Sequence, residues 1–441
     1  MKKNFPIKTK VVGAALCMLL LVPASLMGQE KMAITTSSDE AKKLFIEGRE
    51  QLERLHMNKA NNLFEKAIDK DPNFALAYLH LFQAMGDGSM DAQNHLDKAV
   101  RLSDQVTKGE KHMIHFAKSM GESDEKAIMK HMTAMQDLHP KDERVQMWSG
   151  YYYYSMEDYD KAIKHFKKAT DINSRYHPVY NLLGYSYMAS GMPDEAEKSF
   201  KKYLDLLPDE ANPHDSYAEF LLNQGRFDES IKHYNKALKM NPAFVASYKG
   251  LADNYLFQGN FKMARDHYRN YYNKNSNTNV KFNGLLYEAS VDLHENKPDQ
   301  ALMVIDRYIK MAEEKNLPYY KVYGTATKGY ILAEIGKTEE GLKHYKKVMK
   351  MVETEDMPQA MRENLKSMAH LWEFYAFTSQ GDMEEAEKSR QRCQSRLDEK
   401  GNKALWKTYH QISGLMEIHK GNYDEARKML TQAWDSPSSW Y

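Results

Sequence analysis

The chain has 441 residues, of which 42% are hydrophobic and 28% charged, a mix typical of a folded protein that excludes a largely disordered one. Lys plus Arg (62) nearly equals Asp plus Glu (61), so no general attraction for phosphate backbones or anionic membranes is expected. Nucleic acid is therefore excluded as the expected partner. With only 13 Pro and 22 Gly, long stretches can form uninterrupted helices.

The first 28 residues have the three parts of a secretory signal peptide. Four lysines between Lys2 and Lys10 precede an apolar run over 11–22, and small residues come after it. We predict a signal peptide over 1–28, cleaved after Ala24 or Gly28; an uncleaved anchor is the alternative. The apolar run is too short to span a bilayer comfortably, so no stable membrane span is expected after cleavage. This predicts an exported protein, periplasmic or otherwise associated with the envelope.

The two cysteines limit the chemistry of the mature chain. Cys17 lies inside the apolar run, and Leu16 stands where a lipobox needs a small residue. Cys393 is then the one cysteine left, which predicts no internal disulfide and no thiolate metal site. Between the signal peptide and the rest of the chain, the polar residues 29–40 are expected to form a disordered linker.

A repeat begins after this linker and is most regular in the middle of the chain. A small residue recurs at steps of 34, and an aromatic residue stands four places after each one. Gly or Ala stands twelve places before each small residue, where it would let two helices approach closely. The small residues are Ala162, Ala196, Ser230 and Ala264, and the aromatic residues are Phe166, Phe200, Tyr234 and Tyr268.

The repeat continues more loosely on both sides. The segment 41–74 fits well, with Gly48, Ala60 and Phe64 in register, and a shorter unit and then one with an extra residue come after it. Beyond Ala264 the small residue recurs at wider steps, which predicts hairpins with longer loops, such as 313–318 and 353–358. These later positions are Ala301, Gly341, Ala386 and Ala426.

This pattern resembles the tetratricopeptide-repeat (TPR) family, whose period of ~34 residues is a helix-turn-helix. The resemblance implies an all-α, right-handed superhelical solenoid of about eleven helical hairpins. It further implies a regular TPR array over 41–278 and TPR-like hairpins with longer loops over 279–441.

The resemblance also indicates where a partner would bind. In the family, the second, fifth, ninth and twelfth places of each first helix face a concave groove. A protein or peptide is therefore the expected partner, although the lysine, asparagine and arginine set that holds chaperone tails is missing. In the best-registered repeats the predicted groove residues are Met147, Tyr151, Tyr154, Asn181, Tyr185, Met188, Asp215, Glu219, Lys249 and Asp253.

Chemistry-bearing motifs are sparse. The sequence after the leader has no GxSxG, HExxH, P-loop or GxGxxG motif, which favours a protein that is not an enzyme and needs no cofactor. Met129, Met132 and Met135 lie near His131, and thioethers with imidazoles could hold Cu(I). Their spacing is also that of an apolar helix face, which favours core packing over a metal site and leaves copper binding as an open alternative.

Together these features predict a non-catalytic protein- or peptide-binding scaffold or adaptor of the bacterial cell envelope. The alternative is a carbohydrate- or other small-ligand-binding protein on the same frame, with tyrosine stacking supplying the affinity.

Overall fold

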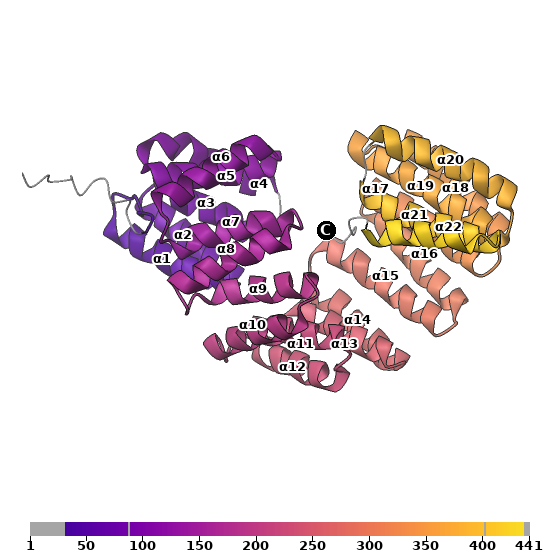
Figure 1. Ribbon diagram of the computed structural model, residues 1–441, viewed down its shortest axis with the longest axis horizontal. Coiled ribbons are helices and arrows are strands. Elements are labelled where there is room, and N and C mark those ends of the chain that lie inside the picture. The colour runs from indigo at the N-terminus through magenta and orange to yellow at the C-terminus, as the bar shows by residue number, and fades with distance from the viewer. Residues whose placement is uncertain (1–30, 87–88, 401–402, 436–441) are drawn as a thin grey trace, which may run out of the picture. The chain divides into compact units, whose positions relative to one another are not determined.

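The computed structural model describes residues 31–86, 89–400 and 403–435, and every regular element within these ranges is helical (Figure 1). The predicted signal peptide lies outside the described residues. Helices pair in chain order into eleven hairpins within the described ranges, so the expected all-helical TPR-like architecture is confirmed. The chain divides into two compact units, residues 1–208 and 209–441.

Unit 1 holds five hairpins, in which each odd-numbered helix packs against the even-numbered helix that comes next. The first helices of neighbouring hairpins also contact one another: α1 contacts α3, α3 contacts α5, and α7 contacts α9. The first helices therefore form one face of the stack. The helices are α1 (Asp39–Glu53), α2 (Met57–Lys70), α3 (Ala75–Met85), α4 (Met90–Leu102), α5 (Lys108–Glu122), α6 (Glu125–Leu138), α7 (Glu143–Ser155), α8 (Tyr159–Ile172), α9 (His177–Ala189) and α10 (Pro193–Leu206), with a short 3-10 helix, η2 (Ser103–Gln105), after α4.

Unit 2 holds six hairpins built in the same way, with first helices again in contact, as α11 with α13 and α17 with α19. The helices are α11 (Ala211–Asn223), α12 (Phe227–Met240), α13 (Val245–Phe257), α14 (Phe261–Lys274), α15 (Thr278–His294), α16 (Pro298–Glu314), α17 (Pro318–Glu334), α18 (Thr338–Thr354), α19 (Gln359–Gln380), α20 (Met383–Lys400), α21 (Lys403–His419) and α22 (Tyr423–Asp435).

Glycine and aromatic residues at the predicted repeat positions hold the two helices of a hairpin together. A Cβ added at Gly150 would lie 2.4 Å from the ring of Phe166, and one at Gly184 would lie 2.5 Å from Phe200. Both rings are fully buried. Only glycine allows this approach, so the register predicted from the 34-residue steps is that of the packed structure.

The turn between paired helices also repeats. Gly191, Gly225 and Gly259, each 34 residues apart, have φ between +69° and +72°, a left-handed conformation that glycine adopts at no steric cost. Glu157 holds the same place one repeat earlier with φ of 58°. The tight turn therefore belongs to the repeat geometry, and glycine is its preferred occupant.

The expected longer loops after residue 278 are wrong in detail. The connection between α16 and α17 is only Lys315–Leu317, and the one between α18 and α19 is Glu355–Pro358. The extra residues lengthen the helices instead: α15 to α18 have 17 residues each, whereas α8 to α14 have 13 or 14. Longer helices bury more apolar surface per hairpin, which extra loop residues would not.

The expected disordered linker 29–40 is also wrong from Lys31 onward. Residues 31–37, which we call the N-terminal strap, lie extended against unit 1, and Ser38 caps α1. The Met32 amide donates to Asp142 Oδ2 (2.8 Å), and the Thr35 amide donates to Glu110 Oε1 (2.7 Å). Polar composition predicted disorder, but buried carboxylates remote in sequence bind the backbone of this segment.

Apolar contacts reinforce the strap. Met32 and Ile34 pack against the hydrophobic core of unit 1. The Thr36 hydroxyl and the Ser37 amide both donate to Asp71 Oδ2, at 2.5 and 2.8 Å. The strap thus satisfies three carboxylates, those of Asp71, Glu110 and Asp142, each of which is at most 5% exposed. Their desolvation would be costly without these donors.

Candidate functional site

A cavity of about 570 Å³ lies on the face that the first helices of unit 1 form. Three of the predicted groove residues meet there, Met147 and Tyr151 from α7 and Asn181 from α9. Helical steps of four place Met147 and Tyr151 on one side of α7. Its volume is in the range of known ligand pockets, which makes this cavity the candidate functional site.

The other predicted residues of unit 1 are not among those that line the cavity. Tyr185 is half-buried and meets the ring of Phe200 edge-on, with centroids 5.2 Å apart. Tyr154 packs against Tyr159 at 5.8 Å, and Met188 is half-buried on the last turn of α9. Their assignment to a binding surface stays a prediction.

Sequence reasoning missed most of the apolar wall. Many of the lining residues that were not predicted lie on α1, α3 and α5. These are first helices of the looser repeats, to which the rule for groove residues was not applied. The same rule of places would have found several of them, since Arg49 and Phe116 stand at the ninth place of their repeats and Arg144 at the second. The additional apolar and aromatic residues include Leu52, Phe82, Met113, Phe116, Met120, Trp148, Tyr176, Leu182 and Tyr203.

Arg144 is the charged residue most firmly fixed in this wall. Its Nε donates to Glu53 Oε1 (3.1 Å), its Nη1 to Glu143 Oε1 (3.3 Å), and its guanidinium lies 5.2 Å from the ring centre of Tyr176. Burial opposes its charge, but Glu53 and then Tyr176 and Glu143 raise the pKa of Arg144 above its ordinary value. Arg144 is therefore a cation with its counterions in place.

Arg49, on α1, lines the same cavity but has no hydrogen-bonded carboxylate within the described residues; Glu53 and Asp142 act on it only at longer range. Its Nε is buried and lacks a hydrogen-bond partner within the described residues, and its guanidinium lies 5.6 Å from the ring of Phe45. Burial, and then the charge of Arg144, lower the pKa of Arg49 from its ordinary value. Two guanidinium groups of the wall thus share one wall carboxylate, that of Glu53.

His80 lies between these groups and the core. It is 5% exposed, and its Nδ1 donates to the Leu76 carbonyl oxygen at 2.9 Å. Burial, together with the charge of Arg49, lowers the pKa of His80 to about 3. The imidazole is therefore neutral at physiological pH and adds no charge to the cavity.

A smaller cavity of about 200 Å³ adjoins the first. The N-terminal strap forms part of its wall through Lys31, Met32, Ala33 and Ile34. The two cavities share five lining residues, so the strap lies at one end of the candidate site. The shared residues are Arg49, His80, Met113, Arg144 and Trp148.

The predicted groove residues of unit 2 form internal polar contacts. Lys249 pairs with Asp253 (Nζ–Oδ2, 2.8 Å), whose other oxygen accepts from the Tyr268 hydroxyl at 2.5 Å. Asp215 is 8% exposed and accepts from the Ser247 hydroxyl at 2.6 Å. Burial raises the pKa of Asp215 to about 7, and the charge of Glu219 acts in the same direction.

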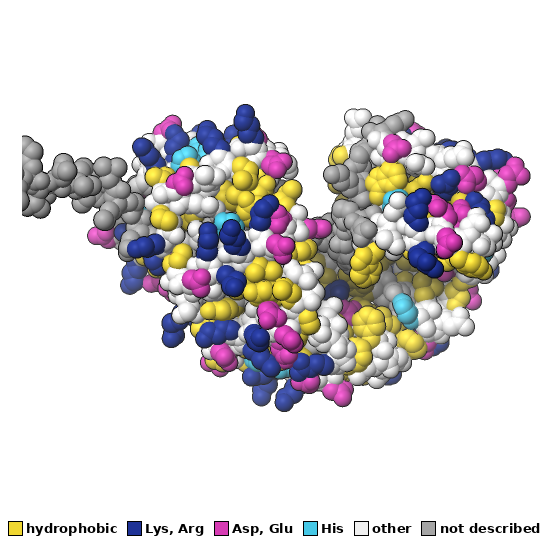
Figure 2. All heavy atoms as spheres, in the orientation of Figure 1, with side chains coloured by type: hydrophobic (Ala, Val, Ile, Leu, Met, Phe, Trp, Pro, Cys, Tyr) yellow, Lys and Arg dark blue, Asp and Glu magenta, His cyan; other side chains and the backbone are white. Residues whose placement is uncertain are grey.

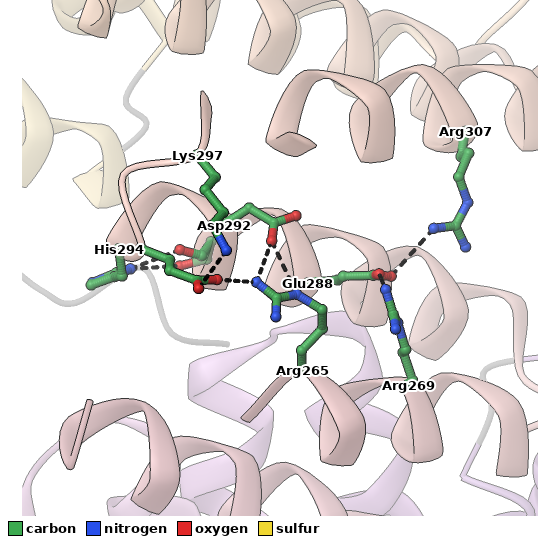
Figure 3. Close-up of polar contacts among 9 residues, drawn as sticks. Arg265, Arg269, Glu288, Asp292, His294, Lys297 and Arg307 are labelled. Atoms are coloured by element: carbon green, nitrogen blue, oxygen red, sulfur yellow. Dashed lines mark hydrogen bonds and ion pairs between the residues drawn. The ribbon is translucent and has the colours of Figure 1, made fainter. Parts of the chain in front are cut away.

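Unit 2 also contains a network of fully paired arginines between α14, α15 and α16 (Figure 3). Arg265 bonds Asp292 (2.6 Å) and Glu295 (2.5 Å), and Arg269 bonds Glu288 at 2.6 Å. Glu288 and Asp292 are almost completely buried. Every arginine, lysine and carboxylate drawn there has a partner on α14, α15, α16 or the connection between α15 and α16, so we interpret this network as structural.

Within the described residues, no group of three His, Cys, Asp or Glu side chains is placed to hold a metal ion. Met132 and Met135 are buried in the core of unit 1, and Met129 packs against it, as the helical spacing favoured. His112 Nδ1 and His131 Nδ1 lie 2.9 Å apart and share a hydrogen bond. Cys393 is 1% exposed, and burial raises the pKa of its thiol to about 12.

Comparisons with known proteins agree with the repeat pattern. Residues 150–191 match a family described as TPR repeat, and residues 177–210 and 218–279 match families described as tetratricopeptide repeat. The chain therefore carries TPR repeats in this region, and repeats of this kind commonly mediate contacts between proteins. No curated protein matches the chain.

Several solved structures are similar to this chain. A tetratricopeptide repeat protein from Parabacteroides merdae ATCC 43184 is 16% identical, with 65% of this chain and 98% of that chain covered and a TM-score of 0.41. Yeast Tom70 is 17% identical, with 64% of this chain and 63% of that chain covered and a TM-score of 0.43. The MamA protein is 19% identical, with 40% of this chain and 93% of that chain covered and a TM-score of 0.33. A likeness at this level identifies no partner.

Among the helices of the described ranges, none combines the length and the apolar character that crossing a bilayer requires.

Proposed function

We propose that this protein is a non-catalytic scaffold or adaptor that binds a protein or peptide partner in the unit 1 cavity. The observation that carries the proposal is the lining itself, in which aromatic rings and methionines from α3, α5 and α7, together with Tyr176 and Tyr203, line one cavity of about 570 Å³. Tyr, Trp and Met are enriched in the cores of protein interfaces. A few such anchors in a desolvated pocket supply most of the affinity of an interface.

The surface elsewhere supports a partner recognised by shape and apolar contact rather than by net charge. On the face shown in Figure 2, lysine and arginine side chains are interspersed with acidic and hydrophobic ones. Formal net charge is only +1. A polyanionic partner would require a concentrated basic surface.

We further propose that the protein acts in the bacterial cell envelope. This part rests on the signal-peptide pattern of residues 1–28. Sequencing the amino terminus of the protein recovered from an osmotic-shock fraction tests it. A mature terminus at Ser25 or Gln29 in that fraction supports export, and a chain found intact in the cytosol contradicts it.

The binding proposal is tested by placing a photo-crosslinking amino acid at Tyr151, which is 42% exposed at the cavity. The matched control carries it at Met90, which is 84% exposed on α4 and does not line the cavity. We expect discrete crosslinked proteins from position 151 that position 90 does not give, and that Trp148→Ala removes. Identical patterns from both positions would exclude the cavity as the partner site.

A further inference from the structure

We propose that the outer face of the last described hairpin, α21 and α22, is a homodimer interface, on which two copies of this chain pack with their α22 helices antiparallel. Four apolar side chains between 43% and 87% exposed form this surface, which we call the α22 face: Ile418, Tyr423, Leu430 and Trp434. They line a hollow of about 490 Å³. The face belongs to unit 2, so this interface is separate from the unit 1 cavity and from the partner proposed for it.

The α22 face consists of repeat positions that the next hairpin covers elsewhere in the array. Counted from the small residue of each repeat, Tyr423 holds the place of Phe227, whose ring stacks on Phe257 of the next hairpin with centroids 6.3 Å apart. Trp434 holds the place of Tyr272, which packs against the core that the next hairpin forms. Within the described ranges no hairpin comes after α22, and these rings stay exposed.

Leu430 shows the same loss of cover. Phe166, Phe200 and Tyr234 hold its place in the regular repeats and are at most 3% exposed, whereas Leu430 is 43% exposed. One side of Leu430 rests on Gly414 of α21, where an added Cβ would lie 2.8 Å from it, so its other side is the exposed one. A contiguous apolar surface of this kind is rare on a monomer and marks an interaction site.

The first described hairpin, α1 and α2, has a different outer face. The hollow there is lined mainly by exposed polar side chains, those of Glu47, Glu50, Asn58, Lys59 and Asn62. A polar outer face is what the terminal repeat of a soluble array requires. Such a face offers no apolar complement to Trp434, which excludes head-to-tail packing of copies. The apolar complement that the protein itself provides is a second α22 face.

The spacing of side chains on α22 makes the face complementary to itself. Tyr423, Arg427, Leu430 and Trp434 follow one another at steps of four, three and four, which is the stripe of a packed helix pair and reads the same from either end. A two-fold axis therefore sets Tyr423 of one copy against Trp434 of the other, and Arg427 against Leu430. The stem of Arg427 can cover leucine while its guanidinium meets an aromatic ring.

The area available indicates a weak, reversible dimer. Tyr423 is 68% exposed and Trp434 is 87% exposed. Since a ring of this size presents about 150–250 Å², the two rings contribute roughly 300 Å² per copy. Ile418, Leu430 and the stem of Arg427 add to this, but the total stays below the about 800 Å² per partner of a standard interface. We therefore expect a dissociation constant in the micromolar range.

Sedimentation velocity of the full chain, from about 1 to about 100 µM, measures the association. We expect a monomer–dimer equilibrium within this range. Trp434→Ala should weaken it at least about tenfold, because a large central ring carries much of the binding energy of an interface. Met303→Ala removes a side chain that is 69% exposed on α16, outside the α22 face, and should leave the dissociation constant unchanged. Circular dichroism shows whether both variants are folded.

Cysteine crosslinking tests the antiparallel arrangement. Arg427→Cys places one thiol of each copy near the two-fold axis, so a short bismaleimide should join two copies. The native Cys393 is 1% exposed and should not react. Lys346→Cys, at an exposed residue of α18, should give no crosslinked dimer under the same conditions.

Each contrary result has its own meaning. A chain that is monomeric throughout the range overturns the inference, and so does a dimer that Trp434→Ala does not weaken. A dimer that Trp434→Ala weakens but Arg427→Cys does not crosslink overturns the antiparallel arrangement. If the full chain is monomeric and a chain ending at Asp435 dimerises, residues 436–441 cover the α22 face, and the assignment to a second copy is wrong. Crosslinking from Tyr151 reports separately on the proposed function.

Discussion

Both units place arginine side chains next to buried acids, but they complete the pairing differently. In unit 2, Arg265 and Arg269 each bond a carboxylate that is less than 5% exposed, on the neighbouring helix α15. In unit 1, Arg144 is paired in the same way, whereas the Nε of Arg49 in the same cavity wall has no hydrogen-bond partner within the described residues. Unit 2 contains the opposite case, a buried acid without a bonded cation. Asp215 accepts its hydrogen bond from a serine hydroxyl instead.

The difference separates structural charges from those available for binding. A buried ion pair with all partners in the protein fixes the packing of its helices, although its net contribution to stability can be small. A buried charge without a partner costs free energy that a ligand can recover, which is why perturbed groups cluster at functional sites. By this criterion the paired arginines in Figure 3 are structural.

The largest expected loss of stability comes from breaking a buried ion pair in unit 2. Arg265→Ala removes the cation from Asp292, which is 3% exposed and lies in the last turn of α15, where the helix dipole already disfavours an acid. We expect unit 2 to lose about 3–5 kcal/mol in urea unfolding. Lys262→Ala, which breaks the exposed pair with Asp266, should change stability by less than about 1 kcal/mol. Equal effects would mean that burial does not distinguish these pairs.

The next effect concerns the unpaired acid. Because the pKa of Asp215 is raised to about 7 in the folded protein, the fold holds a proton that the unfolded chain releases near pH 4. Its contribution to stability therefore falls as the pH rises from about 4 to 7, and the full cost is present above pH 7. Asp215→Asn should abolish this slope and stabilise the protein at pH 8 by up to about 4 kcal/mol.

Unfolding in urea at pH 5 and pH 8 measures this effect, with Asp266→Asn at an exposed acid as the control. A slope that is the same in the wild type and in Asp215→Asn would show that Asp215 is ionised in the fold.

A smaller effect tests what the two units share. Gly184→Ala in unit 1 would place a Cβ 2.5 Å from Phe200, and Gly329→Ala in unit 2 would place one 2.8 Å from Tyr345, in each case on the other helix of the same hairpin. Overpacking at such contacts costs about 1–3 kcal/mol, so both changes should lower stability similarly in thermal unfolding. Gly121→Ala, where nothing lies within 4 Å, should instead be neutral or stabilising by about 0.5–1 kcal/mol. A loss in only one unit would mean that the hairpins are packed differently.

The smallest expected change in stability is at Arg49, and it can be compared directly with that of Arg265→Ala. Arg49→Met removes an unpaired charge and keeps an apolar stem against Phe45. We expect the stability of unit 1 to change by less than about 1 kcal/mol, or to rise, in the same urea titration that shows the loss for Arg265→Ala. A loss as large as that of Arg265→Ala would mean that Arg49 is stabilised by carboxylates of the fold as strongly as Arg265 is.

Part of the candidate site could be predicted from the sequence, and the reason is visible in particular residues. Met147, Tyr151 and Asn181 were found because their repeats keep a strict 34-residue register, from which helix faces can be assigned directly. Phe82, Met113 and Met120 lie on helices of looser repeats, where the register that the rule needs is weaker. The rule that the ninth place of a repeat faces the groove still applies in these looser repeats, since Arg49 and Phe116 hold that place and line the cavity.

The N-terminal strap shows a different limit. Its sequence is short, and its few apolar residues, Met32, Ala33 and Ile34, stand in a polar segment that predicted disorder. Order comes from Asp71, Glu110 and Asp142, which lie on segments 34 to 110 residues away along the chain. A local pattern cannot reveal partners that only folding brings together.

The sequence by itself determined the helices, their pairing into hairpins and the close contacts between small and aromatic residues, such as Gly150–Phe166 and Gly184–Phe200, within hairpins. Those features depend on neighbours within one repeat, where the helical period and the absence of a Cβ leave a single packed arrangement. Only the tertiary structure decided which charges are paired. The bond between Arg144 and Glu53 joins residues 91 apart in sequence, and the lack of one at Arg49 depends on where every nearby carboxylate already points. Coulombic and hydrogen-bond energies change over a few ångströms, and such distances are set by the stacking of hairpins rather than by any local pattern.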